Sequence, residues 1–200
     1  TDFYFSALLS VFRKVGDLSL AEKLFQGCVS DGKLIENAQE EILEVLGFLK
    51  YEPVKPVLIK YALDGESSDY YYTKCAILGL LNFDCTGIEG RIQAEIEMCY
   101  GQNLFSEFAP ALVSKLPARA EILEKLYELG STTASTDCNA GIVLGFSLCG
   151  TEGEAYFRKI LFDPQWETGA SATGTVYFTF DGLVNLGITF GELYQTIRLM

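Results

Sequence analysis

The stretch EEILEVLGFLKYEPVKPVLIKYALDGESSDYYYTKCAILGLLNFD, residues 40–84, contains one pattern twice. In each copy, an apolar segment with a glycine leads into a short turn that carries an acidic residue. The glycines, Gly47 and Gly79, are 32 residues apart, as are the turn residues Glu52 and Asp84. A sequence period of this size is typical of stacked helix pairs, which form extended surfaces for other macromolecules.

The period continues along the rest of the chain. The equivalent turn positions are Asp17, Glu52, Asp84, Pro117, Gly150 and Gly187, at intervals of 35, 32, 33, 33 and 37 residues. Five residues before the turn, glycine recurs at Gly47, Gly79, Gly145 and Gly182. Because a helical glycine is destabilising by roughly 1 kcal/mol relative to alanine, this recurrence indicates close approach between helices. The alternative is chance in a chain with 19 glycines.

Apolar spacing within the segments favours helices over strands. Ile42, Val45, Leu46 and Leu49 follow the i, i+3, i+4, i+7 pattern of one helix face, and glutamates fill the other face. We therefore predict an all-α protein. The predicted helix pairs lie near residues 2–29, 35–64, 68–99, 104–129, 136–162 and 174–199.

Residues 38–84 resemble two consecutive HEAT-like repeats of the phycobilisome (bilin) lyase type. Lys74, Ala76, Leu78-Gly79 and Asp84 fit the repeat pattern, as do Leu46-Gly47 and Asp64. The resemblance recurs at residues 138–162 and is weak at both ends of the chain. Two features depart from the pattern: the Val-Arg pair that opens the repeat is missing, and Pro117 replaces an acidic turn residue.

The resemblance implies an α-solenoid, a right-handed superhelix of about six HEAT-like pairs in one domain spanning residues 1–200. We expect a protein-interaction scaffold or chaperone-like adaptor that uses its concave face, with another protein as partner. The alternative is a subunit of a bilin lyase that presents a linear tetrapyrrole to a phycobiliprotein. Repeat motifs identify an architecture and not an activity.

Composition argues against several other classes of protein. The formal charge is −12, from 27 acidic and 15 basic residues, so a nucleic-acid backbone would be repelled on average. The sequence contains no run of 18 apolar residues, and we expect no membrane span. With reduced thiols, the expected location is cytoplasmic.

The sequence offers no recognisable catalytic or metal centre. It contains no histidine, so imidazole bases and ligands are excluded. Its six cysteines are Cys28, Cys75, Cys85, Cys99, Cys138 and Cys149, and their spacings match no common zinc pattern. We expect reduced thiols, no metal, no cofactor and no catalytic residue. If the protein is an enzyme, a bilin lyase-type subunit is the expected form.

Basic residues are concentrated in the second helix of each predicted pair. They are Lys23, Lys55, Lys60, Arg91, Arg119, Lys125, Arg158, Lys159 and Arg198. If these helices line a concave face, Lys60, Arg91, Lys125, Arg158 and Arg198, together with Tyr194, are candidates for binding an acidic partner or the propionates of a tetrapyrrole. The alternative is that the basic residues form ion pairs with acids of neighbouring repeats.

Aromatic residues form a second candidate surface. Tyr70, Tyr71 and Tyr72 are adjacent, and successive helical residues turn by about 100°, so at least one of them should be exposed. Trp166 precedes the segment 168–175, which is rich in Gly, Ser and Thr. We predict a loop there, with a short strand at 175–180 as the alternative. The predicted partner-binding aromatic residues are Tyr70, Tyr71, Tyr72 and Trp166.

Overall fold

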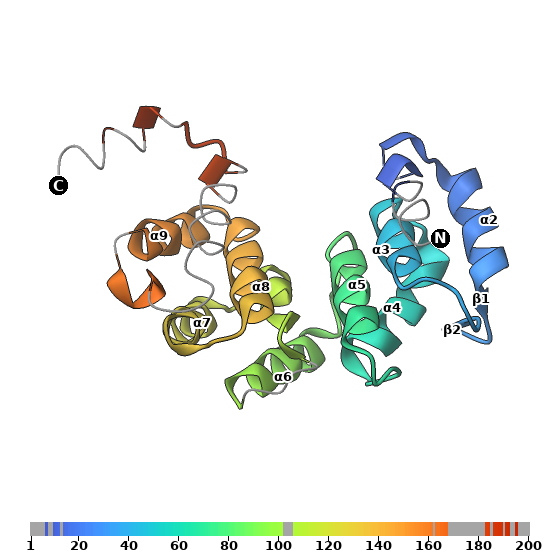
Figure 1. Ribbon diagram of the computed structural model, residues 1–200, viewed down its shortest axis with the longest axis horizontal. Helices are drawn as coiled ribbons and strands as arrows, with labels where there is room; N and C mark the ends of the chain where they lie inside the picture. Colours follow the sequence, from blue (N-terminus) through green and yellow to red (C-terminus); the bar gives the residue numbers. More distant parts are fainter. Residues whose placement is uncertain are drawn as a thin grey trace. The chain divides into compact units, whose positions relative to one another are not determined.

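The protein is mostly helical in the computed structural model (Figure 1). The structure describes residues 14–101, 106–161 and 163–167, and near the ends residues 7, 10–12, 183–184, 186–189, 191–192 and 195. The all-α prediction is therefore confirmed for this part of the chain. Among the described residues, no helix is both long and apolar enough to cross a membrane.

The elements follow one another with short connections. In chain order they are α2 (Leu18–Cys28), β1 (Val29–Ser30), β2 (Lys33–Leu34), α3 (Glu41–Phe48), η1 (Glu52–Val54), α4 (Lys55–Leu63), α5 (Tyr70–Leu80), α6 (Glu89–Tyr100), η3 (Ala109–Lys115), α7 (Ala120–Thr132), α8 (Thr136–Ser147), α9 (Thr151–Ile160) and η4 (Pro164–Glu167). The predicted turns at Asp17, Glu52, Asp84, Pro117 and Gly150 fall next to or between these helices. The predicted pair at 174–199, and the loop or strand before it, lie almost wholly outside the described residues.

The chain divides into two compact units, Thr1–Arg91 and Ile92–Met200. In the first unit, α5 packs against both α3 and α4, and α2 packs against α3 (Figure 1). Side chains on these packed faces are almost fully buried, including Leu43, Leu46, Leu58 and Ile77. The superhelix and the single-domain organisation stay predictions.

Side-chain caps fix the starts of two helices in the first unit. Asp17 Oδ1 accepts a hydrogen bond from the Leu20 amide of α2 at 2.9 Å. Asp69 Oδ1 does the same for Tyr71 of α5, also at 2.9 Å. Each cap satisfies an amide that has no partner within the helix. The start of α5, which carries the three tyrosines, is thus held in place.

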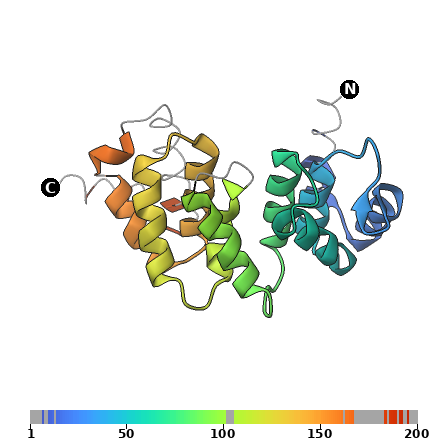
Figure 2. The ribbon, with the colours of Figure 1, turned by 90° about the horizontal axis from the view of Figure 1, so that it is seen from below.

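In the second unit, α8 packs against η3, α7 and α9, while η4 packs against α7 (Figure 2). Aromatic side chains fill much of this core. The ring centroids of Phe146 and Phe157 are 6.2 Å apart at an interplanar angle of 73°. Phe146 also stacks on Tyr156, with centroids 4.9 Å apart. These contacts join α8 to α9.

Glycine allows close helix contacts at three of the four predicted positions. A Cβ on Gly47 of α3 would lie 2.2 Å from the Gly79 Cα of α5. A Cβ on Gly145 of α8 would lie 2.4 Å from the carbonyl oxygen of Pro110 in η3. Close approach is confirmed at Gly47, Gly79 and Gly145, and chance does not account for these glycines. Gly182 lies outside the described residues.

One correction concerns the segment between the first two predicted pairs, where β1 and β2 form a small antiparallel hairpin that pairs Val29 with Leu34. The helix α2 itself ends at Cys28, next to the predicted end of the first pair at residue 29. The turn residues of the hairpin, Asp31 and Gly32, have φ of 52° and 71°. Positive φ at both positions is typical of the tight Asp-Gly hairpin turn, a signal that the helical interpretation missed.

The second correction concerns the first helix of the fourth predicted pair. That element is the 3₁₀ helix η3, and not an α-helix. Pro110 lies in its first turn. A proline is tolerated there because the first amides of a helix lack intrahelical partners anyway.

Candidate functional site

Most of the predicted concave-face cations form ion pairs within the chain. Arg91 of α6 pairs with Asp64, the residue that follows α4. Lys125 Nζ lies 2.8 Å from Glu121 on α7, and Arg158 lies 2.8 Å from Glu154 on α9. These residues come from the predicted second helices, but each cation already has a carboxylate partner.

Of the three other members of that candidate set, the structure describes one. Lys60 of α4 is half-buried, and its Nζ lies 3.4 Å from where a Cβ on Gly32 would be, beside the hairpin turn. No ion pair of Lys60 is found among the described residues. Tyr194 and Arg198 lie outside them. The predicted set is thus divided between the two units and residues that the structure does not describe, and its arrangement as one basic surface stays a prediction.

A second group of contacts links α7 to α9 and the segment that follows it. Arg119 Nε lies 2.9 Å from Glu152 Oε2, and the Tyr156 hydroxyl donates to Glu124 at 2.9 Å. The Tyr127 hydroxyl donates to Asp163 at 2.5 Å. The partners are 33, 32 and 36 residues apart, about one sequence repeat. This supports the alternative that basic residues pair with acids of the neighbouring repeat.

The same contacts shift the pKa values of the side chains that form them. The Tyr156 hydroxyl, and to a smaller extent Lys159, lowers the pKa of Glu124 against the effect of desolvation. Desolvation, followed by the bond to Glu124, raises the pKa of Tyr156 to about 12. Lys159 Nζ lies 4.8 Å from the Tyr156 ring centroid and 5.2 Å from that of Tyr127. This geometry stabilises α7 against α9 and leaves Tyr156 protonated at neutral pH.

The three adjacent tyrosines at the start of α5 have three different environments. Tyr71 is 60% exposed, which confirms that at least one is exposed. Tyr72 is half-buried, donates to the Ala38 carbonyl at 3.2 Å and stacks on Tyr61. Tyr70 is half-buried and meets Tyr71 edge-on, with centroids 5.8 Å apart. Tyr72 thus anchors the helix while Tyr71 faces solvent.

Trp166 belongs to the core of the second unit. It is only 4% exposed, and its ring packs against Gly130, where an added Cβ would lie 2.0 Å from a ring carbon. Its ring centroid is 5.6 Å from that of Tyr127. A side chain buried in this way does not contribute to a binding surface, although the sequence analysis included it in one.

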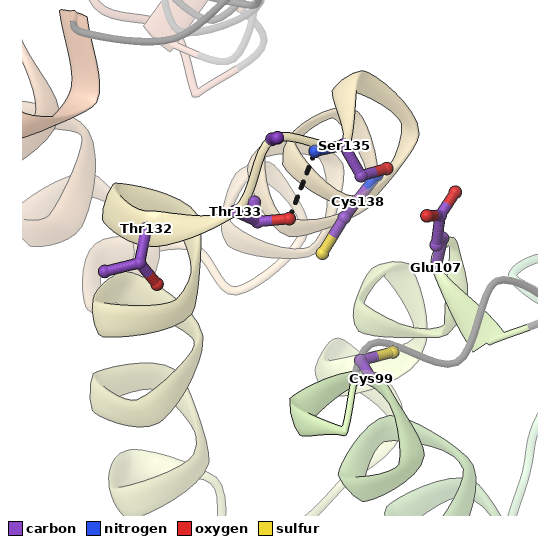
Figure 3. Close-up of a pocket in the computed structure, with 7 residues that line it drawn as sticks. Cys99, Glu107, Thr132, Thr133, Ser135 and Cys138 are labelled. Atoms are coloured by element: carbon purple, nitrogen blue, oxygen red, sulfur yellow. Dashed lines mark hydrogen bonds between the residues drawn. The ribbon is translucent and has the colours of Figure 1, made fainter.

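The second unit also contains a pocket that the sequence analysis did not predict (Figure 3). Its volume is about 380 Å³. The lining includes Cys99 near the end of α6, Glu107 before η3, Thr132 at the end of α7, Thr133 and Ser135 between α7 and α8, and Cys138 in the first turn of α8. Residues far apart in sequence thus surround one hollow, and no local motif marks them.

Hydrogen bonds order the rim of this pocket. Ser135 caps α8 by accepting from the Cys138 amide at 3.1 Å, and its own amide donates to Thr133 Oγ1 at 3.2 Å (Figure 3). The Cys99 thiol donates to the carbonyl of Ser106. The segment between α7 and α8 is therefore fixed relative to α8.

Both pocket thiols are held in the neutral form. Burial raises the pKa of Cys138 to about 12, and the Glu107 carboxylate adds to the rise while a hydrogen bond with Thr133 opposes it. Burial, and then Cys138, Glu95 and Glu107, raise the pKa of Cys99 well above the usual range. Neutral, buried thiols are weak nucleophiles. The pocket can bind through hydrogen bonds and charge more readily than through thiolate chemistry.

Two cysteines outside the pocket, Cys75 and Cys149, are also buried, at 8% and 5% exposed. Burial raises the pKa of Cys149 to about 11 and shifts that of Cys75 further upward. Within the part of the chain that the structure describes, no three Cys, Asp or Glu side chains gather in a way that would hold a metal ion.

Comparison with known proteins gives no relative for this chain. No family model, no curated protein and no solved structure matches it. The resemblance to HEAT-like repeats of the bilin lyase type therefore stays a prediction.

Proposed function

We propose that this protein is a protein-interaction scaffold, and that one docking point is the exposed tyrosine edge of α5. The observation that carries the proposal is Tyr71, a large aromatic side chain 60% exposed on a helix whose other faces are packed. Aromatic residues of this kind are enriched in protein interfaces and among their energetic hot spots.

The proposal rests on rigidity as well as exposure. Asp69 caps α5 immediately before the tyrosines, and Tyr72 fixes the same turn through Ala38 and Tyr61. Residues Ala76, Ile77 and Leu80, further along α5, are fully buried. A pre-ordered aromatic side chain loses little conformational freedom when a partner covers it. Tyr71, edge-on to Tyr70, can therefore contribute contact area at a low entropic cost.

Contacts one repeat apart are consistent with a scaffold. In the first unit Gly47 meets Gly79, and in the second Arg119 pairs with Glu152. Stacked repeats bury their packed faces and leave long open surfaces, which repeat proteins use for binding.

Site-specific photo-crosslinking tests the proposal. A benzophenone amino acid replaces Tyr71, and a matched variant carries it at Leu148, an apolar residue of the second unit that is 47% exposed. In extract of the source cell, we expect a discrete crosslinked protein from position 71 and none of that size from position 148. Excess unmodified protein should compete the product away.

The partner identified in this way is then purified and its affinity measured. Tyr71→Ser should weaken binding at least tenfold, because hot-spot aromatics are typically worth about 2 kcal/mol or more. Tyr71→Phe should retain most of the affinity. Equal crosslinking from both positions, or unchanged affinity of Tyr71→Ser, would contradict the proposal.

The bilin lyase alternative rests on the resemblance alone. A tetrapyrrole propionate at Arg91, Lys125 or Arg158 would have to displace the carboxylate that each cation now pairs with. Nothing in the described residues favours this alternative over the scaffold. A visible-absorption change on mixing the protein with a linear tetrapyrrole would separate the two.

A further inference from the structure

The pocket of the second unit has the dimensions of a ligand site. Small-molecule sites are concave, with volumes of about 300–1,000 Å³ and a few polar groups that fix orientation. This pocket, at about 380 Å³, combines a carboxylate, hydroxyl groups and two buried thiols (Figure 3). Its contacts lie wholly within the second unit, so it is independent of the tyrosine edge of α5.

The charge of the residues that line the pocket indicates which kind of ligand it can bind. Of the described residues that line the pocket, Glu107 alone carries a formal charge, and the thiols of Cys99 and Cys138 are neutral. Within the described chain no ion pair or hydrogen bond of the half-buried Glu107 side chain is found. An anion would be repelled there, whereas a cation would supply a counter-charge to Glu107.

Two hydroxyl oxygens of the lining can act as further acceptors. Thr133 Oγ1 and Ser135 Oγ each accept one bond from a backbone amide, and each oxygen has a second lone pair. The thiols behave as small apolar groups that an alkyl chain can contact. A ligand that suits this lining has a positive charge, several N–H donors and a short apolar body.

We propose that this pocket binds an organic cation with N–H donors, an alkylammonium or alkylguanidinium group, with Glu107 as counter-ion and the Thr133 and Ser135 oxygens as further acceptors. The bound group is either a small free amine or guanidine, or the lysine or arginine side chain of another protein. Both sources share the same chemistry at Glu107.

Titration with butylguanidinium and butylammonium tests the proposal, with neutral butylurea and anionic butyrate as matched probes. Amide NMR shifts of the wild-type protein should change at Thr133–Cys138 and around Glu107 for the two cations. Calorimetry at low salt should give binding at least tenfold tighter for the cations than for butylurea. A bound cation should also slow alkylation of Cys99 and Cys138 by iodoacetamide.

Glu107→Gln keeps the shape of the side chain and removes its charge. We expect this variant to weaken cation binding at least tenfold, whereas Glu128→Gln, which removes an exposed carboxylate of α7 outside the pocket lining, should change it less than twofold. Circular dichroism checks that both variants are folded. Shift changes elsewhere in wild type, equal binding of butylurea, or no effect of Glu107→Gln would overturn the proposal.

Titration with short peptides distinguishes a small free cation from the side chain of another protein. Acetyl-Gly-Arg-Gly-amide and acetyl-Gly-Lys-Gly-amide present the same groups on a polypeptide. If they bind as tightly as the free cations and lose affinity in Glu107→Gln, the natural ligand is a protein side chain. If only the free cations bind in this Glu107-dependent way, it is a small metabolite.

Discussion

The two units use different chemistry to join segments about one repeat apart. In the first unit, α3 and α5 meet through Gly47 and Gly79, with aliphatic side chains around them. In the second, the corresponding sequence separation is spanned by Arg119–Glu152 and by tyrosine–carboxylate bonds. Gly145 shows that the glycine contact also occurs in the second unit. Repeat-spaced polar contacts also occur in both units, because Lys33 pairs with Glu66 and Tyr72 donates to the Ala38 carbonyl in the first. The glycine position and such contacts are therefore shared, and the tyrosine–carboxylate bonds belong to the second unit.

The largest expected effect that separates the units comes from Trp166→Ala. Truncating a buried Trp or Phe typically costs about 3–5 kcal/mol, and Trp166 is 4% exposed against Gly130 and Tyr127. Hydrogen exchange should accelerate strongly in α7, α8 and α9 and remain near wild type in α3 and α5. Equal acceleration in both units would show that they unfold as one.

The control is Tyr71→Ala, which truncates an aromatic residue that is 60% exposed. Exposed substitutions usually stay within about 0.5 kcal/mol of wild type. A loss of stability as large as that of Trp166→Ala would mean that Tyr71 is packed and not available to a partner.

The next effect in size is overpacking at the shared glycines. Gly47→Ala and Gly145→Ala each place a Cβ within 2.4 Å of backbone atoms of the neighbouring element, so the helices must separate. Overpacking of this kind typically costs about 1–3 kcal/mol. Trp166 is the one tryptophan of the chain, so its fluorescence reports the second unit while circular dichroism reports both. Gly145→Ala should shift the fluorescence transition, and Gly47→Ala only the circular dichroism.

Two helical glycines with open surroundings provide the matched control. An added Cβ meets nothing within 4 Å at Gly27 of α2 or Gly90 of α6. Alanine should therefore stabilise these helices, by up to about 1 kcal/mol. If Gly47→Ala and Gly145→Ala stabilise the protein as well, close packing does not explain the recurrent glycines.

The sequence predicted what depends on local pattern. Helical spacing and the regular turns predicted α3 to α5 and α7 to α9, and the glycine register predicted close approach of helices at Gly47 and Gly79. It could not show that Arg91 would pair with Asp64, because that choice depends on how the helices pack. The pocket was missed for the same reason. Cys99, Glu107 and Cys138 come from three separate elements, and only folding brings them to one hollow.

A smaller effect, dependent on pH, belongs to the second unit. The Tyr127 hydroxyl, and then the Gln165 amide, lower the pKa of Asp163 in the folded state. A carboxyl group with a lowered folded pKa stabilises the protein above its unfolded pKa of about 3.9, and this stability is lost as pH falls through the folded value.

Tyr127→Phe should therefore reduce the free energy of unfolding at pH 7, by less than about 1 kcal/mol because Asp163 is near solvent. The difference in the free energy of unfolding between the variant and wild type should become smaller below about pH 4. Urea unfolding at pH 7, 5 and 3.5 measures it. Tyr156→Phe, which removes the bond to Glu124, should behave in the same way. If this difference in the free energy of unfolding becomes larger at low pH, the tyrosine hydroxyls do not stabilise the ionised carboxylates.

The smallest expected effect distinguishes contacts between repeats from contacts within a helix. A double-mutant cycle with Arg119→Met and Glu152→Gln should give a coupling of a few tenths to about 1 kcal/mol, the range of partly exposed ion pairs. Arg119 also donates to the carbonyls of Ser114 and Leu116, so its side chain is held toward Glu152 before the pair forms. The matched cycle uses Lys125 and Glu121, which pair within α7 and are both exposed. That coupling should be smaller and should vanish at 1 M salt, where the screening length is about 3 Å. If the Lys125–Glu121 coupling is the larger one, the repeat-spaced pair has no special part in joining the segments of the second unit.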